Sequence, residues 1–206
     1  MNIVFYTAKF SSAAPVEWAL AELQVPHERV QLDLSKGTQR TPEFLKLNPN
    51  GKVPTLVVDG VPMFEGLAIN LWLADRFGVE KRLWPRPEAP ERGVAMSFAT
   101  WAYVTYGSAF IRRAFATGQR QGDAFRNQAL AEQSEQEIGQ LHAILEQRLA
   151  DRPYLIGEGF SLADLIVASS VGYAVQVGNS LGANARVSAW LERCQARPCL
   201  RALYAG

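Results

Sequence analysis

The stretch that decides the fold is Asn48-Pro49-Asn50-Gly51-Lys52-Val53-Pro54-Thr55-Leu56. It places a proline directly before an apolar run, where a central strand would lose a hydrogen bond because proline has no N–H. A cis peptide bond between Val53 and Pro54, at the first residue of the strand, resolves this conflict. Such a turn exposes the Val53 backbone N–H and C=O, which can then pair with an extended peptide as an added strand. The alternative is an ordinary turn before a hairpin.

A hairpin and a helix start follow this stretch. Asp59-Gly60 joins two apolar runs, which is typical of a β-hairpin. Glu65 and Gly66 then stand at the first turn of a helix, where free N–H groups and the positive end of the dipole make an anion site. Glu65 can also accept a hydrogen bond from an ammonium group. A ligand with a carboxylate and an ammonium on one carbon fits both groups; otherwise Glu65 is only a helix-start acid.

The elements before the hairpin alternate between strand and helix. They are a strand over 3–6, a helix over 15–24, a strand over 28–32 and a short helix capped by Thr41. With the hairpin and the helix that ends at Gly78, the first 77 residues have the order β-α-β-α-β-β-α. That order suits a small mixed sheet with helices on both faces.

The second half of the chain has a different pattern. Three prolines make residues 78–90 a stiff linker. Helical periods then run through 91–116, 124–149, 162–176 and 186–195, with no convincing strand between them. We therefore expect a domain over 1–77, the linker over 78–90 and an all-helical bundle over 91–206.

A capping box stands at the start of the third of these helices. Ser161 is followed three residues later by Asp164, and Phe160 and Leu165 can form the apolar staple. We interpret this motif as structural. On the capping interaction alone, Asp164→Ala would lower the stability of the protein by roughly 1 kcal/mol.

Taken together, the proline stretch and the Glu-Gly-Leu-Ala-Ile segment resemble the glutathione site of the cytosolic glutathione S-transferases, including a bacterial class. The resemblance covers nearly the whole chain. It implies an α/β thioredoxin-like N-terminal domain, a C-terminal all-helical bundle and a cis bond at Pro54. It also implies that Val53 pairs with the cysteinyl backbone of glutathione, and that Glu65 and the Gly66 N–H hold its γ-glutamyl end.

The resemblance extends to a basic loop. Lys52, Gln39 and Arg40 match positions that reach the glycine carboxylate of glutathione or its neighbours, although a solvated basic loop is the alternative. Gly66 is a departure, because the family usually has serine there. Losing that hydroxyl donor to a buried charged acceptor would cost roughly 1–3 kcal/mol of binding free energy.

The group that activates the thiol is expected after the first strand, since family members place it there. Ser11 best matches the serine of some classes and the cysteine of the bacterial class, Ser12 replaces it if the loop is shifted, and Tyr6 ends the strand. Both serines have an alternative role as N-caps before Pro15, and Tyr6 has one in packing. No cysteine occupies this loop, which argues against a mixed-disulfide mechanism of the glutaredoxin kind.

The resemblance implies an enzyme that joins the glutathione thiolate to small apolar electrophiles, or uses glutathione in a related reduction or dehalogenation. A glutathione-binding or protein-interaction module without catalysis is the alternative. Aromatic residues on the helix after the linker would line the electrophile pocket or form core; they are Trp101, Tyr103, Tyr106 and Phe110, with Arg112 beside them.

Composition agrees with a soluble protein of this kind. The net charge is only +1 with 20% charged residues, which disfavours a nucleic-acid partner. No apolar run is long enough for a membrane span. The only cysteines, Cys194 and Cys199, favour a reducing cytoplasm over a disulfide framework. The two histidines do not have the spacing of metal ligands, which argues against a metal site. A homodimer is implied by the resemblance.

Overall fold

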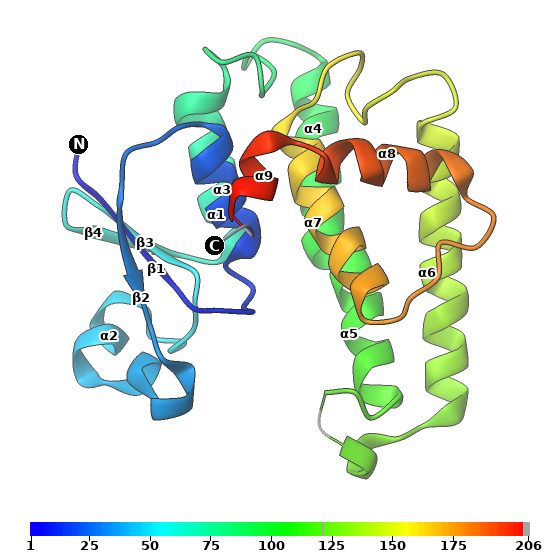
Figure 1. The fold of residues 1–206 in the computed structure, drawn as a ribbon, viewed down its shortest axis with the longest axis horizontal. Helices are drawn as coiled ribbons and strands as arrows, with labels where there is room; N and C mark the ends of the chain where they lie inside the picture. The colour runs from blue at the N-terminus through cyan, green and yellow to red at the C-terminus, as the bar shows by residue number, and fades with distance from the viewer. Residues whose placement is uncertain (121, 204–206) are drawn as a thin grey trace. The chain divides into compact units, whose positions relative to one another are not determined.

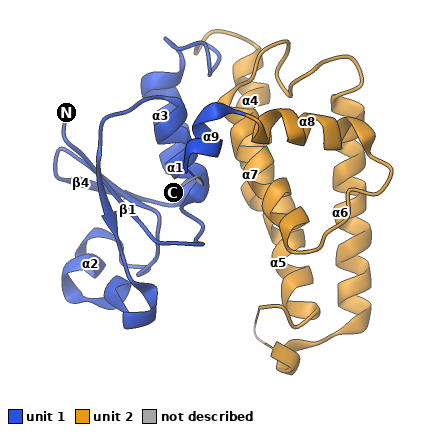
Figure 2. Cartoon of the chain, viewed as in Figure 1, with its two compact units in different colours: residues 1–86, 197–206 blue, residues 87–196 orange. Residues whose placement is uncertain are grey.

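The computed structural model describes residues 1–120 and 122–203, which form two compact units (Figure 2). One unit contains Met1–Arg86 and the described residues from Arg197 to Leu203, and the other contains Pro87–Ala196. The last segment was expected to belong to the helical domain with residues 91–196. In the structure it joins the N-terminal unit instead.

A four-stranded sheet forms the centre of the first unit (Figure 1). Its strands are β1 (Ile3–Thr7), β2 (Glu28–Gln31), β3 (Thr55–Val58) and β4 (Val61–Phe64), in the spatial order β2-β1-β3-β4. β1 is parallel to β2 and antiparallel to β3, and β3 is antiparallel to β4. Phe5 and Leu56 face each other across β1 and β3, and both are completely buried. Pro62 lies on the edge strand β4, where a missing N–H is tolerated.

The helices of this unit follow the order expected from the sequence. They are α1 (Ala14–Glu22), α2 (Pro42–Leu47) and α3 (Gly66–Leu73), which continues as the π-helical turn η3 (Ala74–Gly78), with the short 3₁₀ turns η1 (Leu34–Lys36) and η2 (Thr38–Arg40). The predicted cap of α2 is confirmed, because Thr41 Oγ1 accepts from the Phe44 N–H at 3.3 Å. Figure 1 shows α1 and α3 side by side, where they pack together. The mixed α/β architecture predicted for residues 1–77 is therefore confirmed.

A C-terminal helix that the sequence patterns did not reveal completes the unit. This helix, α9 (Pro198–Leu203), packs on α1. Arg197 Nε donates to the buried Glu22 carboxylate at 2.9 Å, and Trp18 Nε1 donates to the same carboxylate at 3.3 Å. The contact joins residues 175 positions apart in the chain, which explains why no local pattern predicts it.

The regular elements described in the second unit are all helices or helical turns, joined by loops. Its elements are α4 (Glu91–Trp101), the π-helical turn η4 (Ala102–Tyr106), α5 (Gly107–Ala116), the 3₁₀ turn η5 (Gly122–Phe125), α6 (Gln128–Arg148), α7 (Leu162–Gln176) and α8 (Ala185–Gln195). The first three run without a break over the region where one helix was predicted. The π-turn inserts an extra residue into the helical ladder there.

The predicted capping box connects more of this unit than its motif indicates. Ser161 Oγ accepts from the Asp164 N–H, while Asp164 Oδ2 accepts from the Ser161 N–H at 2.9 Å. Asp164 Oδ1 accepts from the Leu155 N–H at 2.8 Å and from Trp190 Nε1 at 2.9 Å. The completely buried carboxylate thus holds the start of α7, the preceding loop and α8 together.

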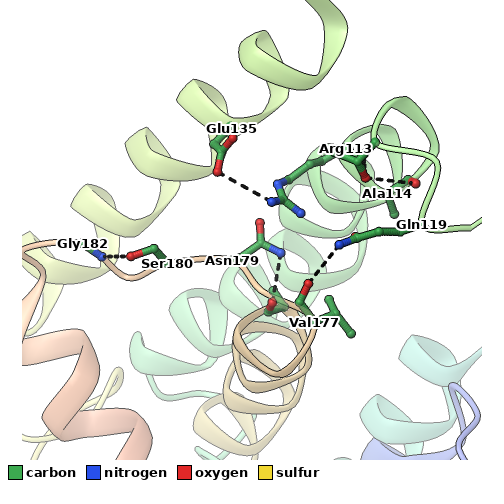
Figure 3. Close-up of polar contacts among 10 residues, drawn as sticks. Arg113, Ala114, Gln119, Glu135, Val177, Asn179, Ser180 and Gly182 are labelled. Atoms are coloured by element: carbon green, nitrogen blue, oxygen red, sulfur yellow. Dashed lines mark hydrogen bonds and ion pairs between the residues drawn. The ribbon is translucent and has the colours of Figure 1, made fainter. Parts of the chain in front are cut away.

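A second group of polar contacts lies where α5 and α7 end (Figure 3). Gln119 Nε2 donates to the Val177 carbonyl at 3.2 Å, and Asn179 Nδ2 donates to the Ala174 carbonyl at 3.0 Å. Arg113 is only 8% exposed, and its guanidinium lies 3.7 Å from the exposed Glu135 carboxylate on α6. The buried Nε and Nη1 atoms of Arg113 have no hydrogen-bond partner among the described residues.

Candidate functional site

The proline stretch forms the bend that the sequence predicts. The peptide bond between Val53 and Pro54 is cis. Asn48 is buried, and its Nδ2 donates to the Lys52 carbonyl at 2.7 Å and to Thr55 Oγ1 at 3.1 Å. Asn48 therefore fixes both sides of the bend. The sequence interpretation assigned Asn48 no role, although asparagine at the start of a turn is a signal for such side-chain-to-backbone bonds.

The loop that carries Gln39 and Arg40 lies close to this bend, because its backbone approaches Gly51. Gly51 has a φ of +58°, and a Cβ atom there would lie 2.9 Å from the Gln39 carbonyl and 3.1 Å from the Arg40 side chain. Only glycine fits this position. Gln39 and Arg40 thus lie next to Gly51, and the exposed Lys52 follows Gly51 directly. The shared binding role of these three residues stays a prediction. The Gln39 Oε1 atom is buried without a hydrogen-bond partner in the described structure.

The start of α3 presents a carboxylate beside free helix N–H groups. Glu65 is the N-cap residue, is exposed, and makes no side-chain cap hydrogen bond. Its φ of +72° is unusual for a residue other than glycine, and strained backbone of this kind is concentrated at functional sites. Gly66 is buried at the first helical position, where backbone N–H groups have no partner within the helix. The arrangement suits a ligand that carries an anion and an ammonium close together.

The two serine candidates lie in the loop between β1 and α1 but make different contacts. Ser11 Oγ donates to the Ala8 carbonyl at 2.7 Å and accepts from the Ala13 N–H at 3.3 Å, so it caps its own loop. Ser12 is exposed, and its Oγ donates to the Val53 carbonyl at 2.9 Å. Of the two hydroxyls, Ser12 is the one in contact with the bend.

Two aromatic residues, Tyr6 and Phe10, precede these serines in the chain. Tyr6 lies within β1, and its ring packs edge-to-face on Phe44 of α2 at 5.6 Å between centroids, which agrees with the packing role considered above. Phe10 has a φ of +52° and its side chain is fully exposed. The loop therefore presents an apolar surface two residues from Ser12.

The protein's own thiols lie outside this loop. Cys194 is buried on α8. Burial and the neighbouring Glu22 carboxylate raise the pKa of the Cys199 thiol, which favours the unreactive protonated form. Within residues 1–120 and 122–203, no group of three or more His, Cys, Asp or Glu side chains could hold a metal ion, and no helix is long and apolar enough to cross a membrane.

Part of the expected aromatic pocket is core. Tyr106 is completely buried, and its hydroxyl lies 3.0 Å from His142 Nε2. Burial raises the pKa of the Tyr106 hydroxyl and lowers the pKa of His142. Trp101 packs on Tyr106, and Arg112 forms an ion pair with Glu137. The pocket interpretation is therefore wrong for Tyr106, because its side chain is enclosed within the helical unit.

Comparison with known families agrees with this geometry. Residues 1–75 match the model of the glutathione S-transferase N-terminal domain, and residues 94–198 match that of the glutathione S-transferase C-terminal domain. The chain belongs to the glutathione S-transferase family. The residues of the candidate site described above lie in the half of the chain that matches the N-terminal model.

Curated relatives and solved structures share this family. Glutathione S-transferase GstB of Escherichia coli is 30% identical over 185 residues, which cover 88% of this chain and 87% of the relative. Disulfide-bond oxidoreductase YfcG of Escherichia coli is 28% identical, covering 95% and 91%. The glutathione-bound theta class glutathione S-transferase of Xanthomonas axonopodis pv. citri is 27% identical, with a TM-score of 0.83 and coverage of 98% and 96%.

Proposed function

We propose that this glutathione S-transferase joins the thiolate of glutathione to small apolar electrophiles. The observation that carries the proposal is the start of α3, where the exposed Glu65 carboxylate stands beside the backbone N–H groups at Gly66. The α-carbon of the γ-glutamyl group carries one ammonium and one carboxylate. The Glu65 carboxylate would accept from the ammonium, and the helix N-terminus would hold the carboxylate.

The rest of glutathione would extend from there along the bend. The Val53 backbone would pair with the cysteinyl unit as an added strand, and Asn48 keeps that backbone in place. Lys52, Gln39 and Arg40 would lie toward the glycine carboxylate. The glutathione-bound relative from Xanthomonas axonopodis supports glutathione as the ligand.

Catalysis requires the thiol to lose its proton and an electrophile to lie next to the sulfur. A hydroxyl of the β1–α1 loop would donate to the sulfur, which lowers the pKa of the thiol and favours the nucleophilic thiolate. The sulfur electron pair would then form the new bond to carbon as the leaving group departs with its own electron pair. The exposed Phe10 ring in this loop supports an apolar second substrate.

Turnover with two substrate types tests the reaction. Purified protein is incubated with glutathione and either chlorodinitrobenzene or hydroxyethyl disulfide, and retention on immobilised glutathione is measured in parallel. We expect retention and a conjugate with the first substrate. Retention with reduction of the disulfide alone would favour the reductase activity that the name of YfcG describes. Retention with no turnover would favour a binding module, and failure of both measurements would contradict the proposal.

Assembly and location belong to the same proposal. A homodimer acting in the cytoplasm fits the family resemblance and the cysteine content. Light scattering coupled to gel filtration tests the assembly state: we expect twice the chain mass of 22.8 kDa. A monomer at micromolar concentration would contradict the dimer.

A further inference from the structure

The two serines of the β1–α1 loop are not equivalent in their hydrogen bonding. Ser11 bonds only within its own loop, to the Ala8 carbonyl and the Ala13 N–H. Ser12 bonds to the Val53 carbonyl, 41 positions further along the chain. The second bond joins the loop expected to activate the thiol to the backbone expected to bind the cysteinyl unit.

A serine hydroxyl has one proton to donate. Redirecting that proton to a ligand leaves the present acceptor without a donor, so the cost of redirecting it depends on that acceptor. Ser11 donates to the carbonyl of the buried Ala8, and breaking that bond would leave a part-buried acceptor without its donor. Ser12 is exposed, and its acceptor is the Val53 carbonyl at the bend. An arriving peptide can supply a replacement donor to that carbonyl, since an added strand donates its own N–H groups.

We propose that Ser12 is the catalytic hydroxyl, that the Val53 carbonyl holds it in the free protein, and that the cysteinyl N–H of glutathione replaces it there. This inference rests on the proposed function. The exchange conserves one hydrogen bond to Val53 and frees the Ser12 proton to point at the sulfur. The thiol proton leaves to solvent water, the electron pair stays on sulfur, and Ser12 keeps its own proton while donating to the thiolate.

Position supports the same assignment. The Ser12 oxygen is 2.9 Å from the Val53 carbonyl oxygen, which is the atom expected to bind the cysteinyl backbone. A cysteine sulfur is only two bonds from its own Cα, so it stays close to the backbone atoms that hold the residue. Ser11 Oγ is instead held by its own loop. The shifted-loop alternative considered from the sequence is therefore the one that the contacts favour.

Thiolate titration distinguishes the two serines. The ultraviolet absorbance of the thiolate in bound glutathione is measured against pH for the wild-type protein, Ser12→Ala, Ser11→Ala and Ser12→Thr, with affinity measured by calorimetry. We expect Ser12→Ala to raise the pKa of the bound thiol by about one unit, a tenfold loss of thiolate near neutral pH. Ser12→Thr, which keeps the hydroxyl, and Ser11→Ala should keep the wild-type titration.

The outcomes separate this inference from the proposed function. If wild-type protein shows no heat of glutathione binding, the proposed function itself fails. If wild-type protein binds glutathione and lowers the pKa of its thiol, but Ser11→Ala rather than Ser12→Ala removes that effect, only the assignment of Ser12 is overturned. Melting temperatures of the three variants check that each is folded.

Discussion

Two acidic residues stand at helix starts in this protein and have opposite surroundings. In the N-terminal unit, Glu65 precedes α3, is exposed, and has a backbone φ of +72°. In the helical unit, Asp164 lies in the first turn of α7, is completely buried, and accepts hydrogen bonds from Leu155, Ser161 and Trp190. The sequence signal is similar in both cases.

We expect this difference to separate an acid that binds a ligand from one that stabilises the fold. A buried carboxylate with every donor in place stabilises the elements that supply those donors. An exposed carboxylate on unfavourable backbone adds little stability, but it is ready to accept from a ligand. Substitution should therefore affect stability at Asp164 and binding at Glu65.

The largest expected effect is on the folding of the helical unit. Asp164→Ala leaves the Leu155 N–H, the Ser161 N–H and the Trp190 indole N–H without their acceptor, so we expect a loss of about 3 kcal/mol or more in unfolding free energy. This exceeds the roughly 1 kcal/mol expected for the capping box alone. Chemical denaturation measures the change. A loss below about 1 kcal/mol would show that these bonds contribute little.

A buried group with few partners should behave in the opposite way. Arg113 is buried with two nitrogen atoms unpartnered, so we expect Arg113→Met to raise the unfolding free energy by roughly 1 kcal/mol. Arg112→Met is the matched control, because Arg112 is exposed and paired with Glu137; it should change stability by less than about 0.5 kcal/mol. Marked destabilisation by Arg113→Met alone would mean that solvent or an ion satisfies the guanidinium.

Replacing Glu65 with glycine should stabilise the protein and weaken ligand binding. Glu65→Gly removes the unfavourable φ, and we expect a gain of about 1 kcal/mol in unfolding free energy together with weaker glutathione binding. Gln24→Gly serves as the control, since Gln24 is exposed with a φ of +50° after α1; it should gain stability without changing affinity. Equal affinities for wild-type protein and Glu65→Gly would argue against the binding role.

The smallest expected effect is a pH dependence in the helical unit. Burial lowers the pKa of His142, so the folded protein keeps it neutral while the unfolded chain binds a proton below about pH 6.5. The contribution of neutral His142 to the unfolding free energy is therefore fully present above that pH. It falls as the pH drops toward the lowered pKa of the folded state, by at most about 1.4 kcal/mol per pH unit. Denaturation of wild-type protein and His142→Gln across this range measures it. If the unfolding free energy varied with pH in the same way for both proteins, His142 would not be the source of the pH dependence.

Local patterns predict much of this molecule because its elements have strong boundary signals. Asp59-Gly60 and Thr41-Pro42 define a turn and a helix start from residues next to one another, and both appear where expected. The contacts that the sequence does not reveal are long-range. Ser12 contacts Val53, and Arg197 contacts Glu22, which is 175 positions away in the chain, so no spacing rule identifies either pair. Tyr106 shows the same limit, because an aromatic helix face is equally consistent with pocket and core.

Calorimetric titration of glutathione into wild-type protein and Glu65→Gln tests most directly whether the start of α3 holds the γ-glutamyl group. Glu43→Gln is the control, because Glu43 is also an exposed acid in the first turn of a helix. Loss of a charged acceptor for the ammonium should raise the Kd roughly 10- to 100-fold, at an unchanged melting temperature. Glu43→Gln should bind like wild-type protein. A Glu65→Gln variant that binds glutathione as tightly as wild-type protein would contradict the placement of the ligand on this helix.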